Sequence, residues 1–216
     1  MLARLTNWLK YDVLLRLFSP LHIESIKLIL GVLRGRKKKE KKRVFVIGQN
    51  KTGTTSVAGL FRDRHSNHLT ISSLSLYLDK KKWHTVLVRV AKRFDSLDDW
   101  PWNQFEFLQT LLSEFHSDSV FVLNTRDPEK WLEAVKRFRS HSKTNMPPHL
   151  SDEQFIKERL ISRNEKIRNL FASHPECLVE VDIEDPDVVQ ILKKRTGWDL
   201  HEMHHLNKTP LRKDQP

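Results

Sequence analysis

Two kinds of segment alternate along the chain: short apolar runs, and longer segments in which apolar residues recur at helical spacing. A continuous apolar run at 44–47 (VFVI) is typical of a strand in a parallel sheet that is covered on both faces. The apolar-rich segments 119–124 (SVFVLN) and 177–183 (CLVEVDI) are predicted as further strands. Between these runs, apolar residues recur at helical spacing, as they do over 57–61 and 105–115. Because strands and helices alternate, the pattern predicts an α/β fold with a central parallel sheet and right-handed crossovers.

Other segments complete this outline. A short strand is predicted at 69–71, and a helix at 83–94, although three valines there also alternate as in a strand. Apolar residues at helical spacing predict helices over 131–138 and 155–171, the second opened by a capping box at Ser151–Gln154. A last helix is predicted to begin at Asp185-Pro186 and to end at Gly197.

The first 33 residues are apolar but repeatedly interrupted by charges. Their uncharged windows fall short of the ~20 residues of a membrane span, and they lack the compact apolar block of a signal peptide. We expect two short amphipathic helices around Pro20, the second capped by Gly35. These helices either pack on the domain or lie on a membrane surface; one face of the second carries Ile23, Ile26, Leu30 and Leu33.

Most of the net positive charge of the chain lies in one short segment near the N-terminus. Residues 34–43 (RGRKKKEKKR) hold eight Lys/Arg and one Glu, so they contribute +7 of the net +11. Such a run is typical of a solvated linker, or of a contact with anionic lipid at about 1 kcal/mol per basic residue. We therefore divide the 216 residues into a helical segment (1–33), a basic linker (34–43) and one α/β domain (44–216). The single cysteine, Cys177, excludes an intrachain disulfide, and a cytoplasmic location is expected, with residues 1–43 as a peripheral membrane contact.

The loop after the first strand carries the clearest candidate chemistry. A loop at a helix N-terminus offers backbone N–H groups to an anion, and this one adds the charge of Lys51. Gly48 and Gly53 match the two glycines of the P-loop pattern, but Thr54 stands where that pattern has lysine. The loop therefore predicts a site for a phosphate-like group, and the alternative is an ordinary strand–helix turn with a solvated lysine. Further hydroxyl donors come from Thr52, Thr55 and Ser56.

The string GQNKTGTTS resembles the 5′-phosphosulfate loop of the sulfotransferases, whose usual core is Pro-Lys-[Ser/Thr]-Gly-Thr-Thr, with Asn50 in place of the proline. The resemblance extends from Arg43 to about Thr209. It implies a P-loop-like three-layer sandwich and a site for 3′-phosphoadenosine 5′-phosphosulfate that needs no metal. The donor-binding residues implied are Asn50, Lys51, Thr52, Gly53, Thr54, Thr55 and Ser56.

A second motif follows the strand at 119–124. Arg126 stands at the carboxyl end of this strand, where ligands bind in open α/β sheets, and its planar fork suits a phosphate. The string Arg-Asp-Pro resembles the 3′-phosphate motif of the sulfotransferases, which implies that Arg126 binds this phosphate. The serine expected eight residues later is Ala134, which leaves Ser140, Lys136 and Arg137 as candidate replacements. Taken alone, an Arg-Asp-Pro string at a strand end is structural about as often as it is functional.

Two catalytic roles follow from the resemblance. Lys51 is expected to stabilise charge on the bridging oxygen during transfer. The family base is a histidine two residues before a proline, and Asp99 takes that place before Pro101. A loop aspartate is otherwise a turn residue or a helix cap, and as a base near neutral pH it needs a pKa raised from ~3.9. Other candidates nearby are Asp95, Asp98, His65 and His68.

The expected function is transfer of a sulfuryl group to a hydroxyl or amine of an acceptor that the sequence does not identify, with no nucleic-acid partner. A carbohydrate, a lipid, a phenol and a small amine are all candidate acceptors. Two alternatives stay open: an atypical P-loop kinase, against which Thr54 argues, and a non-catalytic protein of degenerate sulfotransferase fold that binds anionic membrane or polyanion, which Ala134 keeps open. Residues 201–205 (HEMHH) match the zinc-protease string HExxH. The eleven residues that follow contain no His, Cys or Glu as a third ligand, so no metal site is expected.

Overall fold

A five-stranded, all-parallel sheet forms the centre of the computed structural model, which describes residues 20–62, 66–70, 83–142 and 152–204. The strand order is β2-β3-β1-β4-β5. Phe45 in the central strand lies between Leu97 and Phe121 of its neighbours. This arrangement confirms the α/β class and the parallel sheet. The strands are β1 (Arg43–Val46), β2 (His68–Thr70), β3 (Ser96–Asp98), β4 (Ser119–Thr125) and β5 (Leu178–Asp182).

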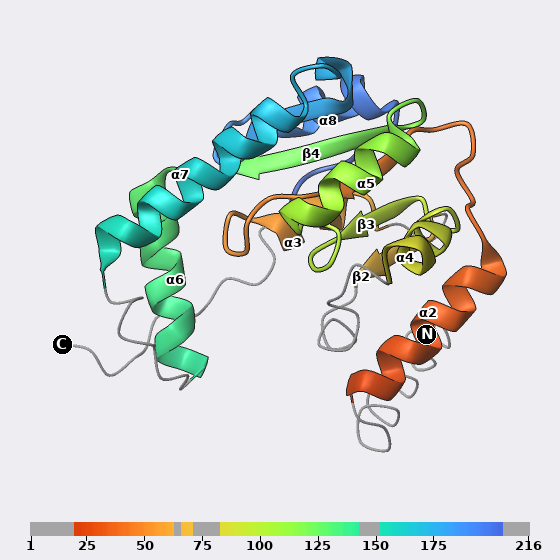
Figure 1. Ribbon diagram of the computed structural model, residues 1–216, viewed down its shortest axis with the longest axis horizontal. Coiled ribbons are helices and arrows are strands. Elements are labelled where there is room, and N and C mark those ends of the chain that lie inside the picture. Colours follow the sequence, from red (N-terminus) through yellow and green to blue (C-terminus); the bar gives the residue numbers. More distant parts are fainter. Residues whose placement is uncertain (1–19, 63–65, 71–82, 143–151, 205–216) are drawn as a thin grey trace.

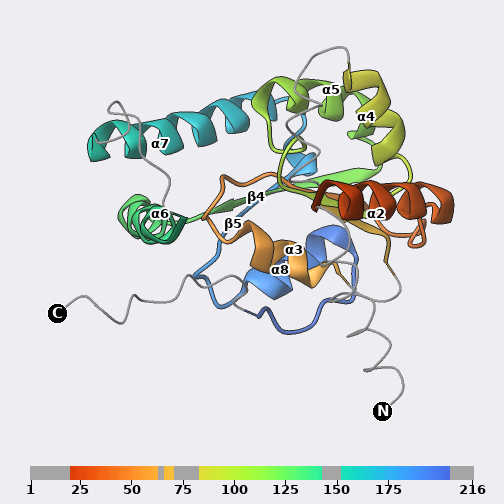
Figure 2. The same ribbon diagram turned by 90° about the horizontal axis from the view of Figure 1, so that it is seen from below.

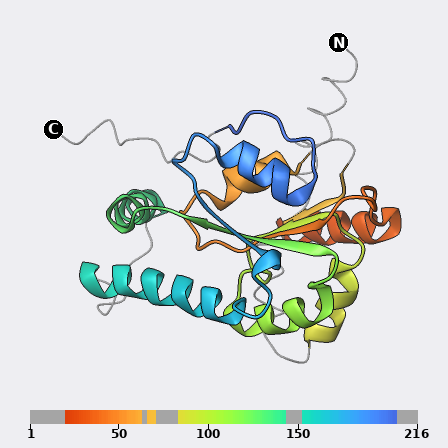
Figure 3. The same ribbon diagram turned by 90° about the horizontal axis from the view of Figure 1, so that it is seen from above.

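Helices cover both faces of the sheet and complete three layers (Figures 2 and 3). One face carries α3 (Thr54–Leu60) and α8 (Val188–Thr196). The other carries α4 (His84–Ala91), α5 (Phe105–Phe115) and α7 (Glu153–Leu170). Beyond the carboxyl ends of the strands lies α6 (Pro128–Ser142), and at the β2 edge lies α2 (Pro20–Arg34). A short 3-10 helix, η4 (Pro175–Cys177), precedes β5.

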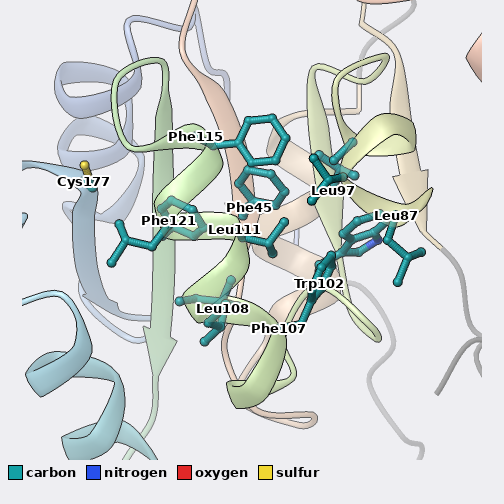
Figure 4. Close-up of a cluster of buried hydrophobic side chains, with 14 of the residues drawn as sticks. Phe45, Leu87, Leu97, Trp102, Phe107, Leu108, Leu111, Phe115, Phe121 and Cys177 are labelled. Carbon is teal, nitrogen blue, oxygen red and sulfur yellow. The ribbon is translucent and has the colours of Figure 1, made fainter. Parts of the chain in front are cut away.

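The larger core lies between the sheet and α4, α5 and α7 (Figure 4). Phe45 stacks on Phe121 with ring centroids 4.9 Å apart, and Phe115 lies 5.3 Å from Phe45. On the opposite face, the Trp198 ring meets Phe61 edge-on at 5.3 Å. Both faces of the sheet are therefore buried, which explains the continuous apolar runs of β1 and β4.

Several predicted boundaries shift in the structure. The segment predicted ambiguously at 83–94 forms the helix α4, and β3 was not predicted as a strand. The N-cap of α7 is Asp152, whose carboxylate accepts the N–H of Phe155 at 3.1 Å. Because α8 begins at Val188, Pro186 lies before the helix rather than at its first position. The helix predicted before Pro20 and most of the loop at 141–149 lie outside the described residues.

The basic segment 34–43 packs on the domain through its inward-facing side chains, although Lys37, Lys39 and Lys42 are exposed. Arg36 lies 3.4 Å from the carboxylate of Asp95, and the nearly buried Arg43 pairs with Asp118 at 3.0 Å. Gly35, with φ of +69°, ends α2 as expected. Within the described part of the chain, the helices are too short or too polar to cross a membrane.

Candidate functional site

The loop between β1 and α3 is shaped by its two glycines. A Cβ at Gly48 would lie 2.2 Å from the Asn124 side-chain oxygen, so only glycine fits beside that amide. Gly53 has φ of +87°, and a Cβ there would lie 2.7 Å from Ile183. Close packing thus requires glycine at both positions, and backbone conformation also requires it at Gly53.

Two side chains from the β4–α6 region hold this loop in place. Asn124, the penultimate residue of β4, donates to the carbonyl oxygen of Thr52 at 2.9 Å and to its hydroxyl at 2.8 Å. The indole N–H of Trp131 in α6 donates to the carbonyl of Asn50 at 2.9 Å. Neither residue was predicted as part of the site, although a polar residue at the end of an apolar strand was a signal for Asn124.

The same contacts change the role of Thr52. Its hydroxyl and its backbone N–H both donate to the carbonyl of Gln49, at 2.6 and 3.1 Å. Thr52 is fully buried and lies outside the cavity lining, so the prediction that its hydroxyl faces a ligand is wrong. The other predicted loop residues do line one cavity: Asn50, Lys51, Gly53, Thr54, Thr55 and Ser56.

Lys51 enters the cavity in a left-handed backbone conformation, with φ of +74°. Such a value is uncommon for a residue with a side chain. Its ammonium nitrogen lies 3.4 Å from the centroid of the Phe138 ring in α6, a cation–π distance. Burial lowers the pKa of Lys51, and the charge of Asp99 opposes this shift.

Asp99 follows β3 directly and lines the same cavity. Its φ of +63° is also left-handed, and its carboxylate accepts the N–H of Trp100 at 3.0 Å. Burial raises the pKa of Asp99, whereas this hydrogen bond and the charge of Lys51 oppose the rise. A raised pKa strengthens a carboxylate as a proton acceptor, so Asp99 has the electrostatic setting that a general base requires.

The other candidate bases lie outside the cavity lining. The fully buried Asp95 binds the N-terminal segment. Asp98 lies 3.1 Å from the partly buried His68, and it also binds Arg62 and Thr70. Although burial favours its neutral form, His68, Arg62 and Thr70 together hold the pKa of Asp98 below its usual value. His65 lies outside the described residues.

Arg126 lines the cavity from the end of β4. Its Nε lies 3.4 Å from Glu184, which follows β5. Ala134 also lines the cavity, so this part of the wall has a methyl group where the sulfotransferase motif has a hydroxyl. Of the candidate replacements, Arg137 lines the cavity, whereas Lys136 pairs with Glu153 and Ser140 donates to the carbonyl of Arg137.

The cavity has a volume of about 1260 Å³. Helix α7 forms one of its walls. From this helix Arg163 donates to the carbonyls of Ile47 and Asn103, both at 2.8 Å. Its other terminal nitrogen, Nη1, is buried and finds no hydrogen-bond acceptor among the described residues. Burial lowers the pKa of Arg163 to about 10. No local pattern identifies this residue, because its carbonyl partners are 116 and 60 positions away.

The zinc-protease string is described only over residues 201–204. Residues 201–204 are not helical, whereas HExxH requires a helix to bring its histidines together, and His205 lies outside the described residues. Within the described ranges there is no group of three or more His, Cys, Asp or Glu placed to hold a metal. Neither a family model nor a curated protein matches this chain.

Proposed function

We propose that the protein is a sulfotransferase that moves a sulfuryl group from 3′-phosphoadenosine 5′-phosphosulfate to a hydroxyl or amine acceptor. The observation that carries the proposal is that Lys51 and Asp99 line one cavity closely enough for each to shift the pKa of the other. A cation for the leaving group and a carboxylate for the acceptor proton are the two groups that this transfer needs.

The composition of the cavity wall supports the donor. Lys51, Arg126 and Arg163 supply positive charge, and Thr54, Thr55 and Ser56 contribute to the same wall. Ligand pockets commonly span roughly 300–1,000 Å³, so a cavity of about 1260 Å³ leaves space for an acceptor beside a nucleotide. Ala134 removes one hydroxyl from the expected 3′-phosphate contacts, and Arg137 lines the same wall.

In the proposed reaction, the bound donor supplies the sulfuryl group. Asp99 accepts the proton of the acceptor hydroxyl or amine as the new bond to sulfur forms. Lys51 stabilises the negative charge that collects on the bridging oxygen as the bond from that oxygen to sulfur breaks, with the electron pair leaving on the 5′-phosphate. Asn124 and Trp131 are positioning residues, because they act on the loop that carries Lys51.

One observation favours a second candidate, a non-catalytic protein of the same fold. Ala134 gives the cavity an apolar surface where a phosphate contact is expected. A cavity that no longer binds the nucleotide would bind 3′-phosphoadenosine 5′-phosphate, the product left by the donor, weakly or not at all. This difference in binding separates the two proposals.

The test is calorimetric titration with 3′-phosphoadenosine 5′-phosphate and, separately, with ATP and magnesium. We expect metal-independent binding of the bisphosphate and at least tenfold weaker binding by Lys51→Ala. The matched control is Lys136→Ala, which removes the same charge from α6 outside the cavity lining. Absence of bisphosphate binding by the folded wild type would reject the sulfotransferase, and preference for ATP with magnesium would favour a kinase.

A further inference from the structure

Helix α2 has two apolar faces, and the structure buries only one. Leu28 and Val32 pack against the larger core, and Gly31 is so close to Phe94 that a Cβ would lie 2.3 Å from its ring. The opposite side follows the helical spacing i, i+3, i+4, i+7 and forms one stripe. The stripe consists of Ile26, Ile29, Leu30 and Leu33, which are 40, 58, 44 and 72% exposed.

Positive charge is present on α2 and on the segment that follows it. Between residues 25 and 42, the exposed cations are Lys27, Arg34, Lys37, Lys39 and Lys42, and the exposed acid is Glu40. The inward-facing cations use the nearby acids: Arg36 pairs with Asp95 and Arg43 with Asp118. The inward-facing cations therefore pair with acids of the domain, and the exposed charged residues between 25 and 42 comprise five cations and one acid.

The stripe and the cations are held in fixed relation. The amide of Asn67 donates to the carbonyls of Gly31 and Gly35 at 2.8 and 3.0 Å, which ties the end of α2 to the domain. The carboxylate of Asp95 accepts the backbone N–H groups of Lys37 and Lys38 at 3.0 and 2.8 Å. Because this backbone is already ordered, a ligand would not have to bear the cost of ordering it.

We propose that this α2 surface, the apolar stripe with its exposed cations, binds an anionic lipid membrane. Aliphatic side chains on an interfacial helix bury in the boundary between headgroups and acyl chains, and neighbouring Lys and Arg are attracted to anionic headgroups. A second copy of the chain fits less well, because a two-fold interface would bring the same basic surfaces together. The combination of apolar and basic residues therefore fits a negatively charged lipid surface.

The α2 surface is remote from the cavity. Figure 1 shows α2 at the end of the molecule opposite α6 and α7, which form the cavity walls, and Figure 3 agrees. Lipid bound at α2 would therefore leave the cavity open. The membrane proposal is independent of the reaction proposed above, and it is tested without any substrate.

The test is cosedimentation of the full chain with vesicles of equal parts phosphatidylglycerol and phosphatidylcholine, beside vesicles of phosphatidylcholine alone. We expect binding to the anionic vesicles that weakens with salt. Ile29→Ser with Leu33→Ser should weaken it by about tenfold or more, as should Lys37→Glu with Lys39→Glu. The controls are Ile161→Ser on α7, where the side chain is also exposed, and Lys194→Glu on α8.

Four results would overturn the proposal. The first is no binding to anionic vesicles, or equal binding to neutral ones. The second is an equal loss of binding in the control variants. The third is a lower melting temperature of the Ile29→Ser, Leu33→Ser variant with unchanged vesicle binding, which would show that another part of the chain covers the stripe. The fourth is a dimer in light scattering that this variant abolishes, which would assign the stripe to a second copy.

Discussion

The side-chain amide of Asn124 donates to both the carbonyl and the hydroxyl of Thr52, at 2.9 and 2.8 Å. This contact joins the end of β4 to the loop that follows β1. Asn124→Leu would leave the buried carbonyl of Thr52 without this donor, so we expect the free energy of unfolding to fall by roughly 1–3 kcal/mol in urea denaturation. Gln154→Leu, which removes an exposed amide bonded to Glu158, should change it by less than about 0.5 kcal/mol. Equal stability of Asn124→Leu and wild type would contradict the role given to Asn124.

The glycines of the loop predict a steric effect. Gly48→Ala places a methyl group against the amide of Asn124, and Gly53→Ala meets Ile183 in an unfavourable backbone conformation. Each should lower the free energy of unfolding by roughly 1–3 kcal/mol. Gly59→Ala, inside α3, serves as the control, because alanine is favoured over glycine in a helix interior. Thermal denaturation of the three variants measures the difference.

Asp99 predicts a stability change that depends on pH. Because burial raises its pKa in the folded state, its contribution to stability is present below the unfolded pKa of ~3.9 and is lost as pH rises through the folded pKa. Asp99→Asn should therefore be more stable than wild type at neutral pH, and the difference should shrink below pH ~4. The same variant should lose sulfuryl transfer if Asp99 is the base. A variant that is less stable than wild type at neutral pH would reject the raised pKa.

Removing the buried carboxylate of Asp95 should lower the stability of the protein strongly, because this carboxylate binds the N-terminal segment. It accepts N–H groups from Lys37, Lys38 and Asn67 and pairs with Arg36. Asp95→Ala leaves these backbone N–H groups without their acceptor and removes one of the two carboxylates that pair with Arg36, so the free energy of unfolding should fall by roughly 3–5 kcal/mol.

The control for Asp95 is an exposed ion pair. Glu114→Ala breaks the pair with Lys92 on the surface, which should cost less than about 1 kcal/mol. Urea denaturation of both variants gives the comparison. Similar losses would mean that the N-terminal segment is not held by Asp95.

The lone cysteine should be chemically inert in the folded protein. Burial raises the pKa of Cys177 to about 11, and its thiol donates to the carbonyl of His116 at 3.0 Å. Because the thiolate is the reactive form, iodoacetamide should modify the native protein slowly at neutral pH and the urea-unfolded protein rapidly. Mass spectrometry of timed samples measures the ratio, and equal rates would contradict the buried environment.

Local sequence pattern was sufficient for most of the fold. The strands β1, β4 and β5 carry apolar runs, and α5 carries a regular helical stripe, so each could be recognised from its own residues. The strand β3 (SLD) is too short and polar to show a period, and it exists because β1 and β2 bond to it from both sides. For α2 the helix was predicted, but Ile26, Leu30 and Leu33 face outward.

The candidate site was predictable only where its residues are contiguous. The loop around Lys51 and the turn at Arg126 were found because spacing alone identifies them. The contacts of Asn124, Trp131 and Arg163 join residues at least 60 positions apart, which no local pattern reports. The prediction for Thr52 was wrong for a related reason. A threonine hydroxyl can bind a ligand, but in the folded loop this hydroxyl donates to the carbonyl of Gln49.

The order β3-β1-β4 places Asp99, Lys51 and Arg126 after three adjacent strands. These strands lie ~4.8 Å from their neighbours, while α6 and α7 supply the surrounding walls of the cavity. Substitutions on the helices can then alter the size and charge of the accepted molecule without separating the three charged groups. For the proposed transfer, the fold would thus allow the acceptor preference to diverge while the three charged groups keep their places.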